Sequence, residues 1–156
     1  TTDKTMINLQ LFDAPTTRRE LPPMVRVISL WEPYASLVVD GIKTLETRTW
    51  PWPYSPSWLV IHASKRFDKE AAKRLKLPLG FHVASGVLIG IVWVAGPSRP
   101  LLPEDEKAAC FYAPDRYAWP LESARRFAKP VPFRGPQKFA SVSRDVVVDA
   151  LGGVKL

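Results

Sequence analysis

Residues 28–50 read ISLWEPYASLVVDGIKTLETRTW, and this stretch contains the signals that decide the fold. The β-branched run that ends at Leu30 predicts a strand over residues 25–30. WEPYASLVVDG follows it, and a proline suits the first position of a helix while a glycine suits the left-handed residue after its last turn. We therefore predict a helix over residues 33–40, and then a second strand over residues 44–50.

The second predicted strand carries charges on one face. Side chains alternate along a strand, so Thr44, Glu46, Arg48 and Trp50 would share a face. Burying two such ions costs on the order of several kcal/mol each unless they pair. Two interpretations stay open, a structural ion pair or the floor of a polar cleft that includes Lys43 from the preceding turn.

The rest of the chain alternates short strands with brief helices. Strands are predicted over 57–64, 86–96, 116–123, 127–133 and 138–142, with Gly90 at a bulge or a barrel bend. A basic turn at Arg125 and Arg126 is predicted between the strands at 116–123 and 127–133. Helices are predicted from Asp68 to Lys76, over 103–108, and from Ser143 to Gly152, with a linker over 78–82. The pattern lacks a βαβ rhythm and predicts an α+β fold, a small β-barrel with short helices packed outside it and flanking a cleft.

The length and composition predict one domain. The chain has 156 residues, of which 46% are hydrophobic and 24% charged. We predict an extended or partly disordered arm over residues 1–23 and a single domain over 24–156. No apolar run approaches the roughly 20 residues that cross a bilayer, so we expect an intracellular, cytoplasmic protein with no membrane contact.

The net charge and the few possible metal ligands limit which cofactors and partners we expect. One cysteine and two histidines show no metal-site spacing, so we expect no metal and no cofactor, and Cys110 in AACFY predicts a buried thiol. There are 22 Lys and Arg against 15 Asp and Glu, a net charge of +7, and the pI is near 9.8. This balance favours an anionic partner, of which nucleic acid is the commonest.

Candidate ligand groups gather at strand ends and in the adjoining turns, where scaffolds commonly present chemistry. They are Trp31, Glu32, Pro33, Tyr34, Lys43, Thr44, Glu46, Arg48, Trp50, His62, Ser64, Lys65, Trp119 and Ser141. Purely structural roles stay open for these residues beside a role in ligand binding. Lys43 could be a solvated turn lysine, His62 a hydrogen-bonded residue at a strand end, and the WPWP tryptophans lids on the core. KRF at 65–67 and RR at 125–126 could each contact phosphate.

Several of these segments together are similar to a known family. The opening stretch resembles the signature of the ASCH domain (activating signal cointegrator homology), a branch of the PUA-like superfamily, with its G-x-K-x-x-E-x-R pattern at Gly41, Lys43, Glu46 and Arg48. IHAS, GVLIGIVWVAG, YAWPLES and KPVPFRGPQKFASV resemble later segments of the family in the same order, over about residues 25–142. The resemblance implies a PUA-like β-barrel of five to seven strands with a cleft beside the helix at 33–40.

The resemblance implies several functions. Roles in the family include RNA or DNA binding, coactivator interaction, ribonuclease activity and hydrolysis of acetylated cytidine. The amidohydrolase branch has a lysine at the place of Lys43 and a threonine nucleophile three residues later, where this chain has Glu46. A carboxylate does not replace a hydroxyl nucleophile activated by an amine, so that mechanism does not carry over intact.

Two hypotheses follow. The first is a nucleic-acid-binding module that recognises single-stranded RNA, or a flipped or modified base, with Lys43, Glu46 and Arg48, and that offers Trp31, Tyr34 or Trp50 for stacking. DNA or a modified nucleoside could take the same place, and no protein partner is identified.

The alternative is a metal-independent hydrolase, either a ribonuclease or a nucleoside-modification amidohydrolase. Lys43 would act as base or oxyanion stabiliser, Glu46 as acid and base, and Tyr34, Ser64 or Ser141 as auxiliary donors.

Overall fold

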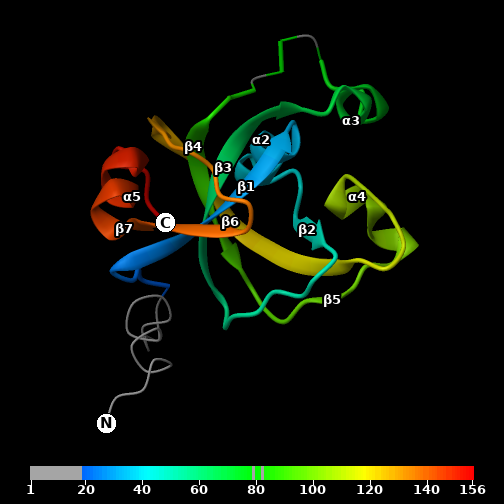
Figure 1. Cartoon of the computed structure of the whole chain (residues 1–156), viewed down its shortest axis with the longest axis horizontal. Helices are drawn as coiled ribbons and strands as arrows, with labels where there is room; N and C mark the ends of the chain where they lie inside the picture. Colours follow the sequence, from blue (N-terminus) through cyan, green and yellow to red (C-terminus); the bar gives the residue numbers. More distant parts are fainter. Residues whose placement is uncertain (1–18, 79, 82) are drawn as a thin grey trace.

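The computed structural model describes residues 19–78, 80–81 and 83–156, and it has a mixed α+β fold (Figure 1). Its strands are β1 (Met24–Glu32), β2 (Leu45–Arg48), β3 (Ser57–Phe67), β4 (Val87–Val94), β5 (Arg99–Pro100), β6 (Tyr117–Pro132) and β7 (Phe139–Ser143). The helices are α2 (Tyr34–Val39), α3 (Lys69–Arg74), the 3-10 turn η1 (Pro103–Asp105), α4 (Glu106–Ala109) and α5 (Arg144–Leu151).

One sheet contains all of these strands. Their order is β2-β6-β4-β3-β1-β7, and the short β5 pairs with β6. Only the β1–β3 pairing is parallel among the described strands. No described pairing joins β2 to β7 at the two ends of this order, so the predicted closed barrel is not confirmed, whereas the α+β class is.

Helices pack on the curved sheet at separate places. In Figure 1, α5 lies at one end of the molecule beside β7, and α3 and α4 lie at the other. Val38 and Val39 of α2 join one apolar core cluster, and Val147 and Leu151 of α5 join a second one. No helix among the described residues is long and apolar enough to span a membrane.

Gly90 of β4 allows α2 to approach the sheet. A Cβ at this position would lie 2.5 Å from the Val39 side chain and 2.5 Å from the Arg125 carbonyl oxygen. The β4–β6 register shifts between Leu88 and Gly90, which confirms the predicted bulge.

Two predicted strands are in fact one. Residues 116–123 and 127–133 were expected to be separate strands joined by a turn, but β6 runs unbroken through Arg125 and Arg126. The chain bends without leaving the sheet because Ser123 adopts a positive φ of 56° and the β4–β6 register shifts nearby. The two arginines are engaged within the protein, since Arg126 pairs with Asp40 at 2.8 Å and Arg125 donates to backbone carbonyls.

The predicted helix caps are confirmed at both capped helices. The Asp68 side chain accepts from the Ala71 backbone N–H at 3.0 Å, and the Ser143 hydroxyl accepts from Val146 at 3.4 Å. Gly152 ends α5 in the left-handed conformation, with φ 58°.

Parts of two predicted segments lie outside the described residues. These are residues 1–18 of the predicted arm, and residues 79 and 82 of the predicted linker. Of the arm, residues 19–23 are described, and they contact the domain. Arg19 pairs with Glu122, its backbone carbonyl accepts from the Trp58 indole at 2.8 Å, and Pro22 is buried.

Candidate functional site

The turn between α2 and β2 buries Lys43. Gly41 takes a positive φ of 76°, and the next two backbone N–H groups donate to the Leu37 carbonyl, which directs the chain back under the helix. Lys43 is 3% exposed, so the interpretation as a solvated turn lysine is wrong. Its ammonium donates to the carbonyls of Leu45, at 2.7 Å, and of Ala109. Burial lowers the pKa of Lys43, and Glu46 opposes this shift.

Glu46 lies between two cations. Its Oε1 is 3.6 Å from the Lys43 ammonium and accepts from the Thr47 N–H at 2.9 Å. Its Oε2 accepts from the Arg48 Nε at 3.3 Å. These contacts offset the desolvation cost of burying the Glu46 carboxylate, since this residue is only 6% exposed. The structural ion pair, one of the two interpretations that the sequence leaves open, is therefore present.

The same side chains form the wall of a cavity of about 470 Å³, which we call the β2 pocket. It is also lined by Ser29, Leu30 and Thr47. The chemically distinctive lining residues are the cations Lys43, Arg48 and Arg116, the carboxylates Glu46 and Asp68, and the aromatic residues Trp31, Tyr34 and Phe111. Three cations against two carboxylates give the β2 pocket mixed charge with a cationic excess.

Arg116 is a pocket residue that the sequence analysis does not single out. Its Nε donates to the Thr47 hydroxyl at 2.8 Å and its Nη2 to the Thr47 carbonyl at 2.7 Å, while its guanidinium lies 5.2 Å from the Phe111 ring centre. Desolvation lowers the pKa of Arg116. No local sequence signal could have found it, because its place depends on the pairing of Tyr117, the first residue of β6, with Arg48.

Tyr34 forms another part of the pocket wall. Its hydroxyl accepts from the Arg74 guanidinium at 3.0 Å, and the Lys43 ammonium lies 5.5 Å from its ring centre. Burial is the main reason that the pKa of Tyr34 is raised, so the phenol remains protonated at neutral pH and can donate a hydrogen bond.

A second hollow adjoins the first. This β3 groove has a volume of about 920 Å³ and shares Ser29, Trp31 and Arg48 with the β2 pocket. Its other lining residues come from the end of β3, from Gly86, and from the segment 133–137. Trp31 stands at the boundary between the two hollows and is 48% exposed. The Arg66 guanidinium lies 5.2 Å from the Trp31 ring centre.

His62 fixes one side of the β3 groove. Its Nε2 lies 2.8 Å from the Phe133 carbonyl and its Nδ1 lies 2.9 Å from the Ser29 hydroxyl. A carbonyl only accepts, so Nε2 carries the proton and Nδ1 accepts a hydrogen bond from the Ser29 hydroxyl. Burial lowers the pKa of His62, which favours this neutral form. The interpretation of His62 as a hydrogen-bonded residue is confirmed, but it lies inside β3, which continues to Phe67, and not at a strand end.

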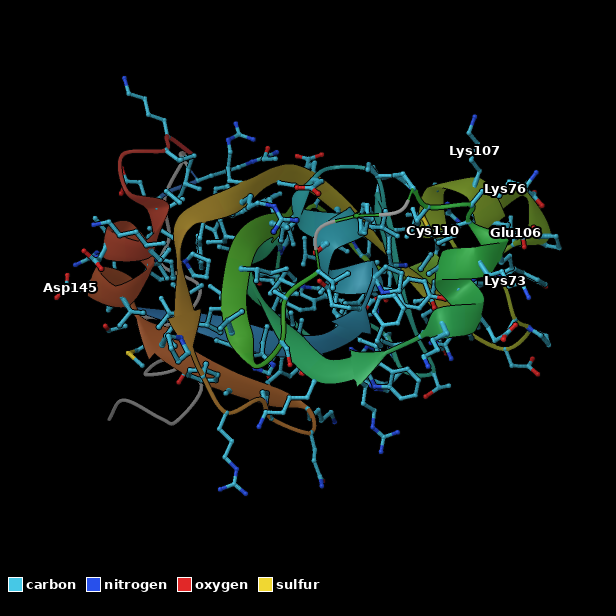
Figure 2. The ribbon with its side chains drawn as sticks, turned by 90° about the horizontal axis from the view of Figure 1, so that it is seen from above. Lys73, Lys76, Glu106, Lys107, Cys110 and Asp145 are labelled. Atoms are coloured by element: carbon cyan, nitrogen blue, oxygen red, sulfur yellow. The ribbon has the colours of Figure 1, made fainter. Side chains whose placement is uncertain are left out.

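Metal ligands do not cluster in the described part of the chain, where no group of three or more His, Cys, Asp or Glu residues could hold an ion. Cys110 is buried as predicted, and burial raises the pKa of its thiol. Figure 2 shows Cys110 beside α3 and α4, while Lys73, Lys76 and Lys107 extend outward into solvent.

A family model for the ASCH domain matches residues 28–131, which is more than half of the chain. The chain belongs to the ASCH domain family.

Solved structures resemble this ASCH domain in fold. ASCH from Zymomonas mobilis is 19% identical, with a TM-score of 0.50 over 83% of this chain and 94% of that one. A variant of that protein with a tyrosine replaced by phenylalanine is 16% identical, with a TM-score of 0.50 over 82% and 96%. These similarities support the PUA-like fold. No curated protein matches this sequence closely enough to count as a relative.

The ASCH domain brings together only some of the sequence-predicted ligand residues. Trp31, Tyr34, Lys43, Glu46 and Arg48 line the β2 pocket, and His62, Ser64 and Lys65 join Trp31 and Arg48 in the β3 groove. The remaining predicted residues line neither hollow, and they are Glu32, Pro33, Thr44, Trp50, Trp119 and Ser141.

Three of the outlying residues have evident structural roles in the ASCH domain. The Trp50 ring packs 4.9 Å from the buried Trp119 ring, in an aromatic cluster with Trp52 and Phe139. This arrangement matches the interpretation of the WPWP tryptophans as lids on the core. Glu32 is 1% exposed, and its carboxylate accepts from Ser36 and Ala84.

Proposed function

We propose that this ASCH domain binds single-stranded RNA and holds one unstacked base in the β2 pocket. The observation that carries the proposal is the fixed carboxylate of Glu46, set among cations at the wall of a cavity of about 470 Å³. Cavities of about 300–1,000 Å³ with a few convergent polar groups are typical of small-ligand sites. A base inside a duplex could not enter it, so the nucleotide must be unpaired or flipped out.

The polar groups of the β2 pocket suit the edge of a base. A carboxylate offers about four acceptor positions. Three contacts with Thr47, Lys43 and Arg48 leave Glu46 one position for a base amino group. The Tyr34 hydroxyl and the guanidinium of Arg116 supply donors for base carbonyl or ring nitrogen atoms.

Other features of the chain favour RNA as the partner. Trp31 offers an exposed ring beside the pocket, and base stacking on such a ring contributes about 1–3 kcal/mol. The net charge of +7 favours a polyanion. RNA binding is also among the roles that the family resemblance implies. Single-stranded DNA and modified nucleosides share the base edge, and they are therefore the comparison ligands in the test.

The geometry of the β2 pocket supports the hydrolase alternative less well than it supports RNA binding. A general base must turn its lone pair towards the proton it takes. The Lys43 nitrogen instead faces two backbone carbonyls and the Glu46 carboxylate, which are the contacts of an ammonium with three donors. Analysis of the RNA after incubation with the protein checks this directly, and we expect intact RNA with or without chelator. Acetylated cytidine is expected to remain unhydrolysed.

We predict that Trp31→Ala weakens the binding of a short single-stranded RNA by about 5- to 150-fold, the equivalent of about 1–3 kcal/mol of lost stacking. Fluorescence anisotropy with a labelled RNA of about eight nucleotides measures this, since such modules cover about 4–16 nucleotides. Duplex RNA of the same sequence is expected to bind more weakly, because its bases stay stacked.

The control is Val148→Ala, which removes a similarly exposed apolar side chain from α5 at the other end of the molecule. It should leave the affinity unchanged. The proposal fails if the wild-type protein binds no single-stranded RNA, or if Trp31→Ala and Val148→Ala bind alike.

A further inference from the structure

We propose that the β3 groove is the path of the phosphate backbone for the nucleotides that adjoin the one held in the β2 pocket. This inference rests on the proposed function. It adds the course of the RNA chain, because a base would bind in one hollow and the adjoining phosphates in the other. The β2 pocket would take the base of one nucleotide, and the RNA chain would continue across Trp31 into the groove.

The two hollows differ in charge. The β2 pocket contains the carboxylates of Glu46 and Asp68. The β3 groove is lined by the cations Arg48, Lys65, Arg66 and Arg134, and no carboxylate is among its described lining residues. The β2 pocket sets its two carboxylates against three cations, whereas the β3 groove sets no carboxylate against its four, so the groove attracts a phosphate more strongly. A neutral base with amino and carbonyl groups fits the opposite arrangement.

Two cations of the groove, Lys65 and Arg134, lack anionic partners in the described part of the chain. Within the described part of the chain, the charged groups of Lys65 and Arg134 have no hydrogen bond or ion pair. Surface arginines elsewhere are paired, as Arg99 is with Asp105 at 2.7 Å and Arg126 with Asp40 at 2.8 Å. Unpaired cations that line one concave surface are the arrangement by which proteins neutralise consecutive phosphates.

Side chains at the boundary could link the two hollows. Arg48 donates one N–H to Glu46 and one to the Ser29 carbonyl, at 3.3 and 3.1 Å. Of its five N–H donors, three therefore have no partner in the described structure and are available to a phosphate at the crossing. The Arg66 guanidinium lies over one face of the Trp31 ring, so a base that stacks on this ring without displacing Arg66 would use the opposite face.

The shape of the groove is fixed before any ligand arrives. The segment 133–137 is held by the contact between His62 and the Phe133 carbonyl, and a Cβ at Gly135 would lie only 2.4 Å from the His62 ring. On the opposite side, the aliphatic stem of Lys65 lies against Gly86, with Cε 3.4 Å from an ideal Cβ position there. A preformed surface reduces the entropy lost on binding.

The test removes the three groove cations that do not also line the β2 pocket, and it leaves the pocket intact. We expect the variant Lys65→Gln/Arg66→Gln/Arg134→Gln to bind a labelled RNA of about eight nucleotides at least about tenfold more weakly. The dependence of log K on log salt should also become shallower by about 2, because each lost phosphate contact on a single strand accounts for about 0.7. Affinity for the four ribonucleoside 5′-monophosphates should change by less than about twofold, since one nucleotide does not span the groove.

Lys107→Gln is the matched control, because Lys107 is exposed on α4 and points away from the domain in Figure 2. It should leave the salt dependence as in the wild-type protein. A triple variant that binds the RNA with wild-type affinity and salt dependence would overturn the groove inference and leave the pocket proposal standing. A wild-type protein that binds no single-stranded RNA would overturn both.

Discussion

Replacing Lys43 by methionine is expected to lower the free energy of unfolding by about 3–5 kcal/mol, which is the usual cost of removing one partner of a buried ion pair. The side chain is 3% exposed, and its ammonium contacts Glu46 and two backbone carbonyls. Methionine fills a similar volume but donates nothing, so the Glu46 carboxylate would lose one of its two cations. Urea denaturation followed by tryptophan fluorescence measures the change.

Lys107→Met is the matched control, since it makes the same substitution at an exposed position of α4 and should change stability by no more than about 0.5 kcal/mol. The double variant Lys43→Met/Glu46→Gln should recover part of the loss, because the buried carboxylate that has lost one of its two cations is removed as well. Contacting residues of this kind show coupling energies of about 0.5–3 kcal/mol. Equal stability of the Lys43→Met and Lys107→Met proteins would contradict the buried pair.

Replacing Glu32 by alanine should cost about 3 kcal/mol or more. Its carboxylate accepts from the Ser36 N–H at 2.7 Å, the Ser36 hydroxyl at 2.6 Å and the Ala84 N–H at 2.8 Å. Each buried donor left without an acceptor costs about 1–3 kcal/mol. The Ala84 contact also ties the segment before β4 to the start of α2, so amide exchange at Ala84 and Ser36 should accelerate together.

Glu20→Ala serves as the control for Glu32, because Glu20 is exposed and has no side-chain partner in the described structure. It should leave both the unfolding midpoint and the exchange of these two amides unchanged. If Glu32→Ala unfolds at the same urea concentration as Glu20→Ala, the carboxylate does not hold this junction.

Local signals in the sequence predict much of the site. The glycine after α2 and the period-2 alternation around Glu46 and Arg48 bring these two side chains to one pocket, as the pattern indicates. What the pattern could not decide was burial. Lys43 looks like a turn lysine because the carbonyl of Ala109, which accepts from it, comes from a helix 66 residues away in the chain.

Contacts between distant segments also explain the other differences between the structure and the sequence-based predictions. Arg116 belongs to the pocket because β2 and β6 are neighbours in the sheet, and a strand order cannot be read from alternation along one strand. The basic dipeptide at Arg125 and Arg126 suggests a turn, but the positive φ at Ser123 absorbs the bend within one strand. Glu32 suits a helix start, and its second partner Ala84 is again remote.

A crystal structure of the ASCH domain bound to a short single-stranded RNA tests the central claim most directly. The account predicts one unstacked base in the β2 pocket with its edge on Glu46, and phosphates that continue past Arg48 towards Lys65 and Arg134. An RNA bound on another face of the domain, or one that leaves the β2 pocket without a base, would contradict it.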